Sequence, residues 1–121
     1  YTRLIMEPVK KVESITIRPL EFQVGSYHVK IALDHDRIAI RAYSEISAKL
    51  FEGMFDTKDL TEQERFVFED CEAVFVMMED CIIDKRKVEL SDVGELKFPY
   101  FFQPNRRSQV EKTFEVKLKE V

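Results

Sequence analysis

The stretch DCEAVFVMMEDCI, residues 70–82, decides how the rest of the chain is arranged. Its apolar side chains recur at steps of three and four residues, a spacing that places them on one face of an α-helix. Glu69 and Asp70 stand at its start, where the helix dipole stabilises negative charge. The pattern therefore predicts an amphipathic helix over 70–82. Its apolar stripe consists of Cys71, Val74, Phe75, Met78, Cys81 and Ile82.

Two extended segments before this helix predict a β-hairpin. Apolar and polar side chains alternate over residues 27–33 and again over residues 37–43, which is typical of half-buried strands. The Asp-His-Asp sequence at 34–36 supplies turn-forming residues between them.

The other segments before the helix are less regular. The expectations for them are a short helix over 3–13, a strand over 14–20, an extended piece over 22–24, a polar loop over 57–64 and a short strand over 66–68. Residues 46–56 fit the helical and the strand spacing equally, so both alternatives stay open.

After the helix the chain returns to strand patterns. We expect a strand over 87–91, a turn over 92–94, a long strand reaching residue 102, a polar loop over 104–108 and a closing strand over 114–118. The predicted fold class is α+β: an antiparallel sheet with one firm amphipathic helix, and a second short helix packed on the same face. We expect one core, formed by Val29, Ile31, Ile38, Ile40, Phe68, Val74, Phe75, Met78, Val88, Leu90, Phe98, Val116 and Leu118.

Composition limits the class of protein. The 121 residues suit a single domain over 1–121, and 45% hydrophobic residues can supply its core. The formal net charge of −4 argues against a dedicated nucleic-acid binder, which is usually basic. No apolar run approaches the ~20 residues that cross a membrane, and no signal peptide is visible. Because the chain begins with Tyr1, we expect it to be a fragment of a longer protein.

The residue types that carry chemistry are few. His35 lies between two aspartates and could bind a metal, but a metal site needs more converging ligands, so a solvated turn is the interpretation we favour. His28 falls within a predicted strand. Cys71 and Cys81 would lie about 15 Å apart along the helix, too far for a shared metal or disulfide. The two thiols therefore indicate core packing in a reduced, intracellular protein. We predict no enzyme activity, no catalytic, cofactor or metal site, and no small-molecule substrate.

The segment FPYFF at 98–102 points to interaction instead. If one side of this strand faces the core, Phe101 points the other way, toward solvent or a partner. Arg106 and Arg107, with Lys112 nearby, form a small basic group that could contact phosphate. Residues 85–87 are a second basic cluster. Phe101, Arg106, Arg107 and Lys112 are the candidate interaction residues.

The order of elements resembles one half of a DNA sliding clamp, the family of proliferating cell nuclear antigen and the checkpoint clamp subunits. The resemblance covers residues 27–121 and is clearest in LKFPYFFQPN at 96–105 and FEVKL at 114–118. It implies a non-catalytic ring subunit that encircles duplex DNA and recruits partners. In that family, the helices that line the channel carry basic residues. Here the outer side of the predicted helix carries acidic ones: Glu72, Glu79 and Asp80.

Two functions follow as expectations. The first is a binding or assembly module, clamp-like, that supports DNA replication or repair in an intracellular, nuclear setting. Its partners would be another protein or copies of itself, and DNA through a ring. The alternative is a small β-rich scaffold domain that dimerises or binds a partner peptide at a sheet edge.

Overall fold

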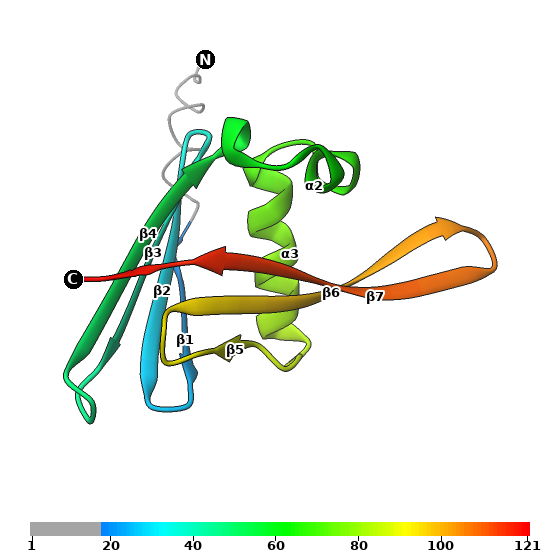
Figure 1. The fold of residues 1–121 in the computed structure, drawn as a ribbon. Coiled ribbons are helices and arrows are strands. Elements are labelled where there is room, and N and C mark those ends of the chain that lie inside the picture. The colour runs from blue at the N-terminus through cyan, green and yellow to red at the C-terminus, as the bar shows by residue number, and fades with distance from the viewer. Residues whose placement is uncertain (1–17) are drawn as a thin grey trace, which may run out of the picture.

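A computed structural model of the protein describes residues 18–121. These residues form two antiparallel sheets, with strand orders β1-β2-β3-β4-β8 and β5-β6-β7 (Figure 1). The strands are β1 (Leu20–Val24), β2 (Tyr27–Asp34), β3 (Arg37–Ser44), β4 (Lys49–Asp56), β5 (Glu89–Leu90), β6 (Glu95–Asn105), β7 (Ser108–Lys117) and β8 (Lys119–Glu120). The helices are the short 3₁₀-helix η1 (Thr57–Asp59), α2 (Glu62–Val67) and α3 (Cys71–Ile83). The predicted α+β class is confirmed.

The predicted hairpin is formed by β2 and β3. Their register pairs Ile31 with Ile40, and both side chains are buried on the face that meets the helix. The turn between them holds His35 at a positive φ of 58°. β1 adds to the other edge of β2, and residues 46–56, for which helix and strand stayed open, contain strand β4.

Helix α3 confirms the prediction for residues 70–82. The Asp70 side chain caps its start by accepting a hydrogen bond from the Ala73 N–H at 3.0 Å. The helix packs against β2 and β3 of the first sheet and against β6 of the second (Figure 1). Its buried side chains are Cys71, Val74, Phe75, Met77, Met78 and Cys81.

The two sheets are joined where the chain passes from β7 to β8. The Leu118 N–H donates to the Gly94 carbonyl at 2.7 Å, and β8 then pairs with β4 at Phe51 and Glu52. Glycines make room for this crossing. A Cβ on Gly53 would lie 2.5 Å from Leu118 Cδ2, and one on Gly94 would lie 2.6 Å from the Leu118 carbonyl oxygen.

The predicted core is confirmed at eleven of its thirteen positions, which are buried in one cluster. Val88 and Leu90 are only partly buried and pack against that cluster. None of the helices in residues 18–121 has the length and apolar character that a membrane crossing requires.

Some predicted boundaries are wrong. Residues 66–68 are not a strand, because α2 occupies Glu62–Val67. That helix begins with two reciprocal hydrogen bonds. The Thr61 N–H donates to Glu64 Oε1 at 2.8 Å, and the Glu64 N–H donates to Thr61 Oγ1 at 3.0 Å. The polar loop over 57–64 therefore contains η1 and the start of α2. The strand over 87–91 shrinks to Glu89–Leu90, and the loop over 104–108 shrinks to a turn at 106–107.

The N-terminal predictions are met only in part. The helix over 3–13 lies outside the described residues, as does most of the strand over 14–20. Within that second range, Arg18 and Pro19 precede β1 and only Leu20 belongs to it. The extended piece over 22–24 is part of β1.

Candidate interaction surface on the β6–β7 arm

Strands β6 and β7 continue past the body of the fold as a projecting two-stranded arm (Figure 1). β5 pairs with β6 only at Lys97 and Leu96, so beyond these residues β7 is the only strand paired with β6 in the described part of the chain. We call residues 99–113 the arm. Isolated hairpins are only marginally stable in water, so side chains near the base of the arm must help to hold it.

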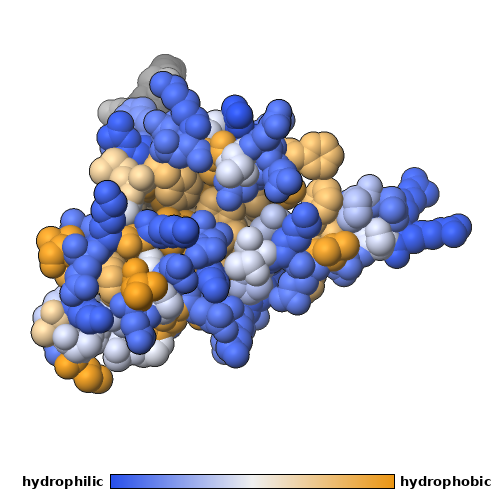
Figure 2. Space-filling view, viewed as in Figure 1, coloured by the Kyte–Doolittle hydropathy of each residue, from blue (hydrophilic) through white to orange (hydrophobic). Residues whose placement is uncertain are grey.

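The end of the arm is a tight turn that exposes two arginines. Asn105 Oδ1 accepts hydrogen bonds from the N–H groups of Arg107 and Ser108, at 2.8 and 3.0 Å. Gln103 Nε2 donates to the Arg106 carbonyl at 3.3 Å. The arginine side chains are free to point into solvent, and Figure 2 shows the end of the arm as hydrophilic.

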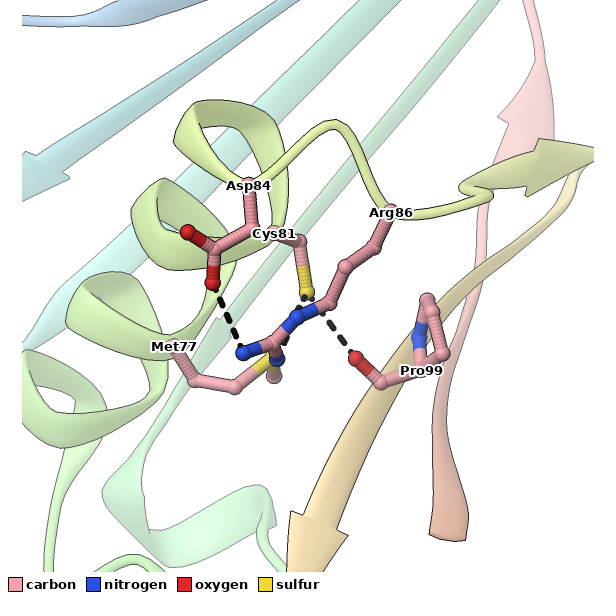
Figure 3. Close-up of polar contacts among 5 residues, drawn as sticks. All are labelled: Met77, Cys81, Asp84, Arg86 and Pro99. Atoms are coloured by element: carbon pink, nitrogen blue, oxygen red, sulfur yellow. Dashed lines mark hydrogen bonds and ion pairs between the residues drawn. The ribbon is translucent and has the colours of Figure 1, made fainter.

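On one face of the arm, the ring of Phe101 lies over the guanidinium group of Arg86. Phe101 remains 50% exposed, and it points away from the core as alternation predicts. The Arg86 guanidinium lies 5.4 Å from the centre of its ring, a cation–π distance. Arg86 is itself oriented by Asp84, whose Oδ2 accepts from Nη2 at 2.9 Å (Figure 3). Phe101 is thus an exposed aromatic side chain with an ordered partner beneath it.

The opposite face of the arm is apolar at its base. Phe102 meets Phe66 of α2 edge to face at 6.0 Å between ring centres. Lys112 Nζ lies 5.7 Å from the centre of the Phe102 ring. Phe66 is 80% exposed and Val110 43% exposed, and Figure 2 shows apolar side chains where the arm leaves the body.

The structure separates the four candidate residues. Arg106 and Arg107 lie together at the end of the arm, whereas Lys112 is four residues down β7 from Ser108. At ~3.4 Å per residue that is roughly 14 Å. Lys112 covers an aromatic ring, and Phe101 is on the other face of the arm. The arm therefore offers a basic end and two aromatic faces, in place of one basic cluster.

Sequence reasoning missed two residues of this surface. The strand predicted over 66–68 misplaces Phe66, although the spacing of Thr61 and Glu64 is a helix-start signal that places it on a helix. Arg86 stands out in the sequence only as part of the basic cluster at 85–87. Its place under Phe101 depends on how β6 returns past the end of α3, which no local pattern encodes.

Both cysteines are buried and free, as their helical spacing predicts. Cys81 Sγ donates to the Pro99 carbonyl at 3.0 Å and lies 3.8 Å from Met77 Sδ (Figure 3). Burial raises the pKa of Cys81, although nearby Arg86 opposes the shift. Burial likewise raises the pKa of Cys71, to about 11, against the opposing effect of a Thr57 hydrogen bond. Neither thiol has the lowered pKa of a nucleophile.

We expect the native thiols to resist alkylation. At pH 8 the thiolate fraction of Cys71 is roughly a thousandth, because its pKa is about 11. Iodoacetamide followed by intact-mass analysis should show no adduct on the folded protein within an hour and two adducts in 8 M urea. Rapid labelling of the folded protein would contradict this burial.

The two histidines lie on the surface, apart from any converging group. His28 Nε2 is 3.3 Å from Glu21 Oε1 on the exposed side of the first sheet. His35 Nδ1 is 2.8 Å from Asp34 Oδ1 in the β2–β3 turn, with 92% of its side chain exposed. Within residues 18–121, no group of three or more His, Cys, Asp or Glu side chains could hold a metal ion.

The comparisons with known proteins return no relative for this arrangement. No family model matches the chain. No curated protein and no solved structure matches it either.

Proposed function

We propose that the protein is a non-enzymatic binding and assembly module whose arm contacts a partner chain. The observation that carries the proposal is Phe101, half exposed and held over the Arg86 guanidinium. Exposed aromatic and arginine side chains with fixed positions are the residues that dominate protein–protein contacts. Because Asp84 already orients Arg86, little side-chain entropy would be lost on binding.

The specific form we propose is a sliding-clamp-like subunit, intracellular and nuclear, that supports DNA replication or repair. The support is the order of elements: a hairpin, an apolar helix packed against the sheets, then a second hairpin and a closing strand. The exposed side of α3 carries Glu72, Glu79 and Asp80, which repel phosphate. Any DNA contact is therefore assigned to Arg106 and Arg107, or to other subunits of the ring.

If the arm contacts a partner chain, a substitution in the arm should weaken association. Phe101→Glu places a carboxylate on the proposed contact and should weaken association by roughly tenfold or more, since aromatic contact residues typically contribute that much. Sedimentation equilibrium over a concentration series measures the effect, with the chain alone and then with candidate partner subunits.

The matched control is Ile46→Glu, which makes the same type of change at a side chain that is 86% exposed and distant in the fold. It should leave association unchanged. Equal effects of the two substitutions, or a strict monomer that binds no partner, would remove the arm from the proposal. Titration of duplex DNA at low salt tests the clamp-like form, and an assembled ring without DNA affinity would exclude it.

The second candidate is a scaffold domain that binds a partner peptide at a sheet edge. The observation in its favour is that the outer edge of β7 has no paired strand over residues 108–117 in the described part of the chain. An unpaired edge of this length is a template for strand addition.

A further inference from the structure

The outer edge of β7 offers an alternating set of free backbone groups. Pro99, which has no N–H, is paired in register with Thr113, and its carbonyl accepts a hydrogen bond from Cys81. Its one backbone polar group, the carbonyl, therefore points away from β7. Pro99 and Thr113 thus form a non-hydrogen-bonded pair. In such a pair the backbone groups of both residues point away from each other, so the N–H and C=O of Thr113 point to the open edge. By the same alternation, those of Glu111 and Glu115 do so too.

A hollow of about 190 Å³ lies beside this edge, between β7, β4 and the start of α2. It runs along the strand, because four consecutive residues, Phe114 to Lys117, line it. Leu60, Phe114 and Val116 give it a buried apolar floor. Small-molecule sites usually have roughly 300–1,000 Å³, so this hollow suits one apolar side chain of a larger partner.

Charge around the edge selects the partner. Asp59, Glu64 and Glu115 border the hollow, against the single basic residue Lys117. Glu111 and Glu115 are exposed on the same face of β7. An incoming strand with basic side chains opposite these two glutamates would pair with both.

The same glutamates disfavour a second copy of β7 in the registers centred on Glu111, Thr113 and Glu115. Two-fold antiparallel pairing centred on Thr113 would place Glu111 opposite Glu115 of the other copy, twice. Centring the pair on either glutamate would place that residue opposite itself. Like charges directly opposite each other are destabilising in these three registers, whereas a different, basic strand meets both glutamates with opposite charge.

We propose that the outer edge of β7 binds an extended basic and apolar peptide of a partner protein by strand addition. Aligned antiparallel, one basic residue faces Glu115, the next residue is apolar and enters the hollow beside Phe114, and a second basic residue faces Glu111. The two basic residues are thus four positions apart. The inference rests on the proposed function as a binding module, but it uses this edge and leaves Phe101 free.

A fluorescein-labelled peptide, Thr-Val-Lys-Leu-Thr-Ser-Arg-Thr, tests the proposal by fluorescence anisotropy. We expect saturable binding, and at least tenfold weaker binding when Glu replaces its Lys and Arg. The protein variant Glu111→Lys/Glu115→Lys should reverse that preference. The control variant Glu45→Lys/Glu79→Lys changes net charge equally at exposed residues away from the edge and should keep it. An unchanged preference in the first variant, or a reversed one in the control, would overturn the proposal.

The backbone contact is tested without altering the protein. N-methylation of the peptide residue that faces Thr113, the Thr after Leu, removes an N–H that donates to β7 and should abolish binding. N-methylation of the following Ser, whose N–H points away, should be tolerated. Equal binding of the two methylated peptides, or no binding of the parent peptide at millimolar concentration, would overturn strand addition. Phe101 is paired with Glu111 across the two strands, so the neutral variant Phe101→Ala is used to separate the sites. Peptide binding that survives Phe101→Ala separates the open edge of β7 from the Phe101 contact, and its loss would place the peptide on Phe101.

Discussion

Replacing Phe75 by alanine is expected to lower the free energy of unfolding by about 3–5 kcal/mol. Phe75 is 6% exposed and belongs to the stripe by which α3 packs into the core. Its truncation removes a buried aromatic ring and leaves a cavity that the surrounding strands can fill only in part. Urea denaturation followed by circular dichroism measures the change as a lower midpoint at constant slope.

The neighbouring residue provides the matched control. Val76 is 48% exposed on the same turn of α3, so Val76→Ala should change stability by less than about 1 kcal/mol. Alanine is also the better helix former, which offsets part of the lost contact. Comparable losses from both substitutions would mean that the stripe does not define the buried face of α3.

This buried face could be predicted because periodicity records it directly. The steps of three and four residues over 70–82 and the alternation over 27–43 both follow from which side chains meet the core. The alternation also predicted the exposure of Phe101, since Leu96, Phe98 and Tyr100 are buried on the other side of β6. These features needed only local pattern.

Features that depend on tertiary contact were not predictable in this way. Residues 46–56 fit both the helical and the strand period, and pairing with β3 makes Lys49–Asp56 the strand β4. The strand predicted over 66–68 is wrong for a local reason instead, because Thr61 and Glu64 start a helix that runs through Phe66. The passage of the chain between sheets at Leu118 leaves no trace in hydropathy, because the alternation that predicts the closing strand over 114–118 continues through Leu118 without a break.

The candidate surface also contains some features that local sequence patterns predict and others that depend on tertiary contacts. Arg106 and Arg107 were predictable at a turn, because Asn105 and Ser108 flank them with turn-forming side chains. Lys112 is close to them in sequence, but the extended strand β7 places it away from the turn. The open edge of β7 was not predictable, because it depends on which strands lack neighbours in the folded chain.

Replacing Gly94 by alanine is expected to cost roughly 2–5 kcal/mol of unfolding free energy. Two independent terms add. Gly94 has a φ of +92°, a conformation that strains any residue with a Cβ. The new Cβ would also lie 2.6 Å from the Leu118 carbonyl oxygen and 2.9 Å from Phe51 Cδ1, where neither backbone nor a buried ring can easily move. The collision falls on the crossing that joins the two sheets.

Gly25→Ala is a control that has backbone strain without a steric collision. Gly25 also has a positive φ, of 58°, but a Cβ there would meet nothing within 4 Å. Gly25→Ala should therefore cost only the conformational strain, about 1–2 kcal/mol. The difference between the two variants, measured by urea denaturation, combines close packing at the crossing with the greater strain at Gly94, whose φ lies beyond the left-handed helical region. If Gly94→Ala cost no more than Gly25→Ala, the two sheets would not be packed tightly against each other at Leu118.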